Sequence, residues 1–217
     1  MLAESFKAKL KARDPKSPNI RTQSFFDGAS RLTSDPTLAD ESSTPSRMLS
    51  DQMINVFFQE WSPLFPILHR PSALNLYTNY VAEPTSVQSP HDIAQLYLIF
   101  GIAAISTEVG GNFNPSTFRR SQSQSNKHDA LSFERMWQRA LDKITKDVSI
   151  PTLQCFLLAE LYWIAKDDSE RLRKCRIITA KLVRRLGLHQ SQRRSSLGPL
   201  LTESRKRLFW VTFTLDW

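Results

Sequence analysis

With 217 residues, of which 41% are hydrophobic and 23% charged, the chain is long enough to bury a core without metal or disulfide staples, and it has no apolar run long enough to span a bilayer. Its two cysteines exclude a disulfide framework and favour a reducing compartment. The net charge of +8 is unevenly distributed, because residues 119–217 contain twenty of the 29 basic residues but only ten of the 21 acidic ones. This basic excess indicates either a solvated helix face or a surface that contacts acidic partners or nucleic acid.

Residues 1–49 are predicted to form a disordered linker or tail. Within them, the run SDPTLADESSTPS at residues 34–46 is rich in Ser, Thr, Pro and Asp and has almost nothing to bury. Such a segment cannot offset the chain entropy that folding would remove. We therefore expect the folded domain to span residues 50–217.

Two predicted helices flank a proline-rich connector. The first helix is expected to have Ser50 as its N-cap, to carry apolar residues at helical spacing, and to end at the first proline that follows. The connector PLFPILHRPS, residues 63–72, holds three prolines, which restrict the backbone to extended conformations. We expect a rigid loop whose Phe65 and Leu68 pack on the core, followed by a short helix over residues 72–81.

The middle of the chain predicts three helices. The one that starts at Pro90 is apolar nearly all round, which is typical of a buried, central helix. Residues 110–127 are polar and are expected to form a loop, and residues 128–146 have the apolar spacing of a helix with one buried face. Ser149 is expected to cap the next helix, whose apolar stripe includes Leu157.

The last two predicted helices carry most of the basic excess. The turn at residues 167–169 leads into a helix with one apolar and one basic face, which Gly187 is expected to end. Thr202 is expected to cap a final helix that reaches Trp217. The outward residues that form a candidate basic surface include Arg171, Arg173, Lys174, Arg184 and Arg185. The whole pattern predicts an all-α fold, an irregular multi-helix bundle with a disordered N-terminal segment.

No group of residues indicates catalysis or metal binding. The sequence has no phosphate-loop, dinucleotide-binding, zinc-protease or serine-hydrolase motif, and its four histidines have no partner at metal-ligand spacing. Cys155 and Cys175 fall on apolar stretches of successive helices and are interpreted as core residues, not as a nucleophile or a ligand pair. We therefore predict that the chain is not an enzyme and holds no cofactor or metal, while an apolar ligand cavity between helices is compatible with the pattern.

Three segments of the chain carry a family resemblance: PLFPILHRPS at residues 63–72, LVRRLGLHQS at 182–191 and ESRKRLFWVTFTLDW at 203–217. In order and spacing they resemble the signatures of the fungal-specific transcription factor domain, the middle homology region of fungal Zn2Cys6 regulators. The resemblance extends over most of the chain, from about residue 50. The residues that carry it are Phe65, Pro66, Leu68, His69, Arg70, Gly187, Leu188, His189, Glu203, Arg207, Leu208, Phe209, Trp210 and Asp216.

The resemblance implies an all-α regulatory domain of a nuclear transcription factor that controls RNA polymerase II-dependent transcription through protein or effector binding. Its partners would be other regions of the factor, co-regulator proteins or a small effector, and no membrane. Members of the family bind DNA through six cysteines around two zinc ions, which this sequence lacks. Zinc and specific DNA contacts are therefore expected only in that absent cluster. Members also continue beyond the final Leu-Asp, so the domain is expected to be incomplete at its C-terminus.

Two further expectations follow. The alternative to a regulatory domain is a helical protein that binds nucleic acid without sequence preference through its basic face. That face lacks the interleaved aromatic residues of a single-strand platform and any recognition-helix motif, so the solvated interpretation is preferred. On the final helix, Trp210 is expected to lie in the core together with Phe65 and Leu68.

Overall fold

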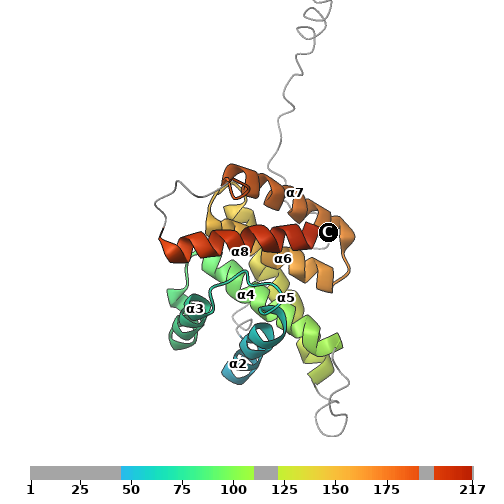
Figure 1. Ribbon diagram of the computed structural model, residues 1–217. Coiled ribbons are helices and arrows are strands. Elements are labelled where there is room, and N and C mark those ends of the chain that lie inside the picture. Colours follow the sequence, from blue (N-terminus) through green and yellow to red (C-terminus); the bar gives the residue numbers. More distant parts are fainter. Residues whose placement is uncertain (1–44, 110–121, 191–197, 217) are drawn as a thin grey trace, which may run out of the picture. The chain divides into compact units, whose positions relative to one another are not determined.

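The computed structural model describes residues 45–109, 122–190 and 198–216, all within the unit Ser34–Trp217. Every regular element in these residues is helical, which confirms the all-α prediction (Figure 1). The elements are α2 (Arg47–Val56), the π-helical turn η1 (Phe57–Trp61), α3 (Arg70–Ala82), the 3-10 turn η2 (Pro84–Ser86), α4 (Pro90–Val109), α5 (Gln122–Ile144), α6 (Ile150–Ala165), α7 (Ser169–Arg185) and α8 (Pro199–Asp216).

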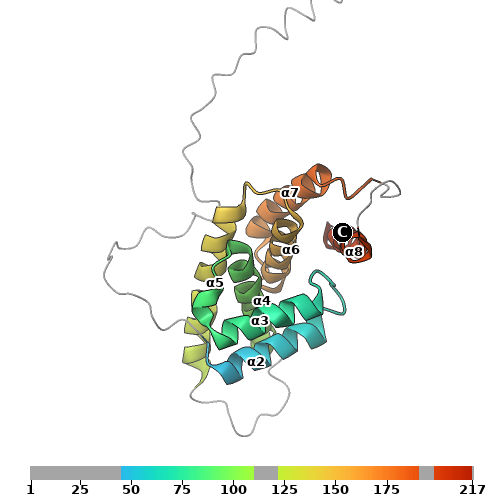
Figure 2. The ribbon, with the colours of Figure 1, turned by 90° about the vertical axis from the view of Figure 1, so that its left-hand side faces the viewer.

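The central helices are α4 and α6, which pack against each other and against α5 and α7 (Figure 2). As predicted, the middle of α4 is buried on all sides, and nearly every residue of α6 from Thr152 to Trp163 is buried as well. Close approach of these helices depends on Gly101 of α4, because a Cβ there would lie 2.9 Å from the ring of Tyr162. Trp137 of α5 stacks edge-on against Tyr162, with ring centroids 5.0 Å apart. Large, rigid side chains therefore fill the centre of the bundle.

A buried carboxylate ties three of these helices together. Glu134 of α5 accepts a hydrogen bond of 2.8 Å from the hydroxyl of Tyr162. It also forms ion pairs with Lys166, just after α6, and with Arg171 of α7, at 3.3 Å in the second case. The Arg171 guanidinium also lies over the ring of Trp163, 4.7 Å from its centroid. A buried carboxylate is tolerated here because charged and polar partners surround it.

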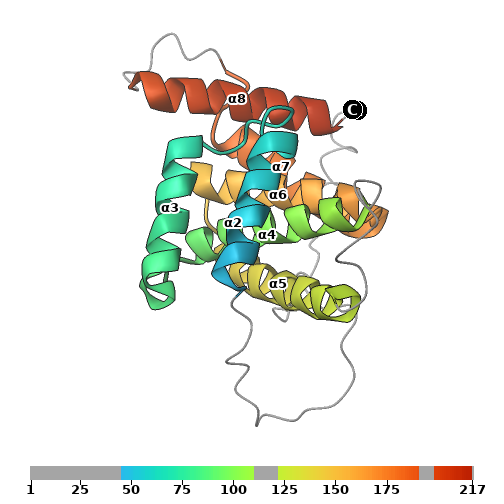
Figure 3. The ribbon, with the colours of Figure 1, turned by 90° about the horizontal axis from the view of Figure 1, so that it is seen from below.

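Helices α2 and α3 lie side by side across α4 (Figure 3). Tyr77 and Tyr80 of α3 stack edge-on with Phe100 and Tyr97 of α4. Helices α2 and α3 are joined through the hydroxyl of Tyr77, which donates to Asp51 at 2.5 Å and lies 2.9 Å from the hydroxyl of Ser50. The prediction that Ser50 caps α2 is wrong: the helix begins at Arg47, and Ser46 accepts the capping bond from the amide of Leu49. Ser50 is instead a buried residue inside the helix.

Helix starts were predicted with mixed success. Ser149 caps α6 at its predicted start, and Asp168, which lies within the predicted turn at residues 167–169, caps α7. Gly187 follows α7 with a φ of +64°, as expected of a helix-ending glycine. Three helices begin earlier than predicted: α3 at Arg70, where a proline occupies its first turn, α5 at Gln122, and α8 at Pro199, where the predicted cap Thr202 lies inside the helix. The predicted tail up to residue 44 and the predicted loop up to residue 121 lie outside the described residues.

Candidate functional site

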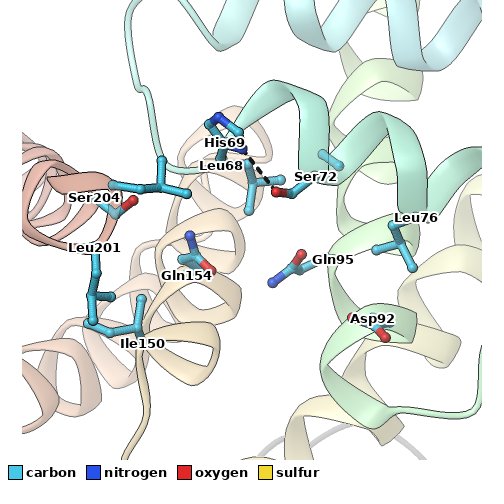
Figure 4. Close-up of a pocket in the computed structure, with 12 residues that line it drawn as sticks. Leu68, His69, Ser72, Leu76, Asp92, Gln95, Ile150, Gln154, Leu201 and Ser204 are labelled. Carbon is cyan, nitrogen blue, oxygen red and sulfur yellow. Dashed lines mark hydrogen bonds between the residues drawn. The ribbon is translucent and has the colours of Figure 1, made fainter. Parts of the chain in front are cut away.

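A cavity lies where α3, α4, α6 and α8 meet (Figure 4). Its volume is about 310 Å³, which is near the lower end of the range for small-molecule sites. The lining combines leucines, an isoleucine and an alanine with serine, glutamine, histidine and aspartate side chains. The lining residues are Leu68, His69, Ser72, Ala73, Leu76, Asp92, Gln95, Ile150, Gln154, Leu200, Leu201 and Ser204.

Several polar side chains at the cavity are held in place by the fold. The ring nitrogen Nδ1 of His69 and the hydroxyl of Ser72 form a hydrogen bond of 2.9 Å at the start of α3. The amide nitrogen of Gln154 on α6 donates to the backbone carbonyl of Ile67 at 3.0 Å, which fixes the side chain and ties the proline-rich connector to α6. Figure 4 shows Gln95 of α4 on the side of the cavity that faces Gln154. The amides therefore offer a donor and acceptor set that is largely formed in advance.

The charge of the cavity favours some ligands over others. Among its lining residues there is no Lys or Arg, and Asp92 is the only acid. Burial raises the pKa of the Asp92 carboxyl above its ordinary value, while the neighbouring His91 acts in the opposite direction. An anionic ligand would meet this carboxylate without a compensating cation, whereas an amine or a neutral hydroxyl or amide compound would find acceptors.

Helix α8 closes one side of the cavity with exposed apolar residues. Leu200 and Leu201 line the cavity and are 59% and 40% exposed. Farther along the helix, Leu208 and Leu215 are buried. In Figure 3, α8 runs across one edge of the other helices. The first turns of α8 are therefore its least packed part, and a ligand in the cavity would cover apolar surface that now faces water.

A second group of polar side chains connects the starts of α4 and α6. His91 at the start of α4 lies 3.1 Å from the carboxylate of Asp147, which also accepts hydrogen bonds from Ser149 at 2.7 Å and from Thr152 at 2.8 Å. These bonds, led by the one from Ser149, lower the pKa of Asp147 below its ordinary value. Because every polar group is used to join the two helix ends, the arrangement is structural.

The structure brings the third family segment into contact with the second, through Arg205 and the backbone of Leu186, and places it at one cavity with the first. Leu68 and His69 of the first segment face the same cavity as Ser204 of the third. Leu68, Leu188 and Leu208 are buried, Phe65, Pro66, His69, Gly187 and Phe209 are half-buried, and Arg70, His189, Glu203, Arg207 and Trp210 are exposed. Arg70 lies 5.5 Å from the ring centroid of Phe58, and Arg207 pairs with Glu203 at 3.0 Å. Asp216 ends α8, and its side chain lies outside the described ones.

The prediction that Trp210 lies in the core is wrong, since 62% of it is exposed. On α8 the buried residues are Leu208, Val211, Thr212 and Leu215, and a helix of 3.6 residues per turn places Trp210 on the opposite face. There its ring stacks edge-on with that of Phe213, with centroids 6.0 Å apart. Leu68 is buried as expected, and Phe65 is only half-buried.

The candidate basic surface of α7 divides into two sets. Arg171 pairs with Glu134 and Asp168, and Lys174 pairs with Glu170 at 2.9 Å, so both have partners within the bundle. Arg173, Arg184 and Arg185 are exposed. The pairs with Asp168 and Glu170 are local, at i,i+3 and i,i+4 spacing, and the sequence analysis missed them. The pair with Glu134 could not be predicted in this way, because Glu134 lies on another helix, far away along the chain.

Within the described residues, no group of three or more His, Cys, Asp or Glu side chains is arranged to hold a metal ion. Burial raises the pKa of both Cys155 and Cys175 to about 12, which keeps the thiols protonated. This agrees with the interpretation of both cysteines as core residues.

No helix in the described part of the chain is long and apolar enough to cross a membrane.

The profile of the fungal specific transcription factor domain matches residues 54–217. The chain belongs to this family. It is 36% identical to the transcriptional activator protein acu-15 of Neurospora crassa over 214 residues, which cover 98% of the chain and 22% of that protein. It is 26% identical to the aurofusarin cluster transcription factor aurR2 of Gibberella zeae, over 79% of the chain and 25% of that protein.

A third relative is the cutinase transcription factor 1 alpha of Fusarium vanettenii, at 23% identity over 79% of the chain and 18% of the relative. The chain thus spans between 18% and 25% of the length of these curated relatives. No solved structure matches this fungal transcription factor domain. The relatives are transcriptional regulators, which supports a role of this chain in transcription regulation.

Proposed function

We propose that the chain is the regulatory domain of a nuclear fungal transcription factor and that it controls RNA polymerase II-dependent transcription by binding a small effector in the cavity beside α8. The observation that carries the proposal is the meeting of the first and third family segments at this cavity, through His69 and Ser204. The match to a family of transcriptional regulators supports the role of the whole factor.

The physical basis of regulation is the weak packing at the start of α8. An effector that contacts Leu200 and Leu201 on one side and the amides of Gln95 and Gln154 on the other would bridge α8 to α4 and α6. If the effector binds only when α8 is packed against α4 and α6, binding shifts the equilibrium of the domain toward that packed position of α8. The position of α8 would then be the signal that co-regulators or other regions of the factor detect.

A substitution that fills the cavity tests the proposal. Ser204→Phe places a large ring in the cavity, and Thr214→Phe makes the same kind of change at an exposed position of the same helix. Small-molecule fractions of a deproteinised fungal extract are screened for an increase in the melting temperature of the purified chain.

We expect a fraction that stabilises the parent and Thr214→Phe but not Ser204→Phe. In cells, a reporter driven by the chain between a foreign DNA-binding domain and an activation domain should lose its response to that fraction only with Ser204→Phe. Equal responses of both variants would contradict an effector site in the cavity.

A further inference from the structure

Helix α7 presents a stripe of cations that the contacts of the bundle leave unused. Arg173, Lys181, Arg184 and Arg185 are exposed, and within the described residues none of them forms an ion pair. Between Glu170 and Glu203 the sequence contains nine Lys and Arg residues and no Asp or Glu. The acidic neighbour of the stripe along the helix is Glu170, three residues before Arg173, and it already forms an ion pair with Lys174. Lys181, Arg184 and Arg185 have no Asp or Glu within ten residues on either side.

An exposed isoleucine lies in the middle of these cations. Ile177 is 51% exposed, and at four residues from Arg173 and four from Lys181 it lies on the same helix face. Arg184 continues this face one turn farther on, so the stripe is about 16 Å long at 1.5 Å per residue. The opposite face carries the buried Cys175, Thr179, Leu182 and Val183. In Figures 1 and 2, α7 is an outer helix with α6 on its inner side.

We propose that this stripe is a docking surface for a short acidic segment of a partner protein, with a large apolar side chain of the partner covering Ile177. Charge complementarity argues for the acidic residues, since three cations in line attract carboxylates at the same spacing. The isoleucine argues for the apolar one, because its exposed half gains stability only against another apolar group. An apolar centre within a charged rim is the usual arrangement of a protein interface.

The same features argue against nucleic acid as the occupant. A duplex offers phosphates to the cations but leaves Ile177 against a charged backbone. The stripe also has no aromatic ring on which an unpaired base could stack.

The test uses the full 217-residue chain and three probes: a 15-residue helical peptide with Glu at helical spacing around two leucines, the same peptide with both leucines replaced by alanine, and a 15-base-pair DNA duplex. Binding is measured by fluorescence anisotropy at low and at physiological salt. The charge variant is Arg173→Glu with Lys181→Glu. Its matched control is Arg135→Glu with Arg139→Glu, which changes the same net charge at two exposed positions of α5. Ile177→Ala tests the apolar contact.

We expect the leucine peptide to bind more tightly than the alanine peptide. The α7 charge variant should weaken binding of the leucine peptide at least tenfold, while the α5 control should change it less than threefold, because specific charge pairing depends on where the charges lie. Ile177→Ala should weaken the leucine peptide about fivefold and leave the alanine peptide unchanged. All variant positions are exposed, so thermal unfolding should confirm that each variant folds.

Three results would overturn the proposal. Duplex binding at least as tight as peptide binding, reduced by the charge variant but not by Ile177→Ala, would assign the stripe to nucleic acid. Equal losses of peptide affinity with the α5 and α7 charge variants would mean that the attraction depends on the net charge of the chain and not on the stripe. No binding of either peptide at low salt would leave the stripe a solvated helix face.

Discussion

Replacing Leu208 and Trp210 by alanine, one at a time, tests the orientation of α8 directly. Leu208 is fully buried, and a buried Leu→Ala change costs about 2–5 kcal/mol of unfolding free energy. Because α8 borders a cavity, its surroundings can relax, and we expect a loss of about 2–3 kcal/mol. Trp210 is 62% exposed and its ring contacts are edge-on ones to Phe209 and Phe213 on the same helix, so its loss should cost about 1 kcal/mol or less.

The assay for this pair is urea unfolding followed by far-UV circular dichroism. Tryptophan fluorescence is unsuitable, because one variant removes a reporter ring. The midpoint shift at unchanged slope gives the difference in unfolding free energy. The double variant adds a check, since both residues lie on one helix but on opposite faces, so the two losses should add within about 0.5 kcal/mol.

An equal or larger loss for Trp210→Ala would refute the reasoning. It would mean that Trp210 is buried, as the sequence alone predicts, and that α8 is rotated by about half a turn relative to its position in this structure. The cavity beside Ser204 would then also be incorrect, because Ser204 lies on the same face as Leu208.

Three other predictions concern the interior and the helix ends. Glu134→Gln removes the charge that pairs with Lys166 and Arg171 but keeps an acceptor for the hydroxyl of Tyr162. Urea unfolding should show a loss of about 1–2 kcal/mol of unfolding free energy for this variant, and a larger loss for Glu134→Ala. Because the pKa of Asp147 is lowered, its contribution to the stability of the folded chain is complete above the ordinary pKa of 3.8 and is lost as the pH falls through the folded-state pKa. The melting temperature of Asp147→Asn should therefore fall less steeply on acidification than that of the parent. Cys155 and Cys175 should react with a thiol reagent only at the rate of unfolding, because both are buried and their thiols have pKa values of about 12; rapid labelling of the native chain would contradict this.

Local signals in the sequence predicted the centre of the fold well. Helix α4 has apolar residues on every side, and only a central position satisfies such a helix. The caps Ser149 and Asp168 and the glycine after α7 are each fixed by a hydrogen bond or a backbone angle that depends on a few neighbouring residues. The cap of α2 was misplaced because Ser46 and Ser50 lie one helical turn apart and both precede apolar residues.

The orientation of α8 was beyond the reach of its sequence. The helix carries apolar residues on both faces, with Leu208 and Leu215 on one and Trp210 and Phe213 on the other. Periodicity therefore does not identify the buried face, and the size of the tryptophan favoured the wrong one. The choice depends on which face matches α6 and α7, where Arg205 of α8 donates to the backbone carbonyl of Leu186 at 2.6 Å. Such contacts between distant segments leave no local pattern.

The cavity was equally hidden, and the reason bears on how this domain works. The family segments supply Leu68, His69, Ser72 and Ser204 to its wall. Its one acidic residue, Asp92, and the amide of Gln95 come from α4, outside all three segments. The signature residues in this chain mostly build the framework: a buried leucine, a left-handed glycine and a surface ion pair. Specificity for an effector would then be set by residues that the signatures do not include.

A direct comparison of three compounds with one ring and different head groups tests this role of Asp92: cyclohexylmethylamine, cyclohexylmethanol and cyclohexanecarboxylate. We expect the amine to bind best and the carboxylate worst, and Asp92→Asn to remove the preference for the amine while leaving the alcohol unchanged, as measured by ligand-observed NMR. Preferential binding of the carboxylate would show that the cavity is not governed by Asp92, and the effector would then have to be sought among anions.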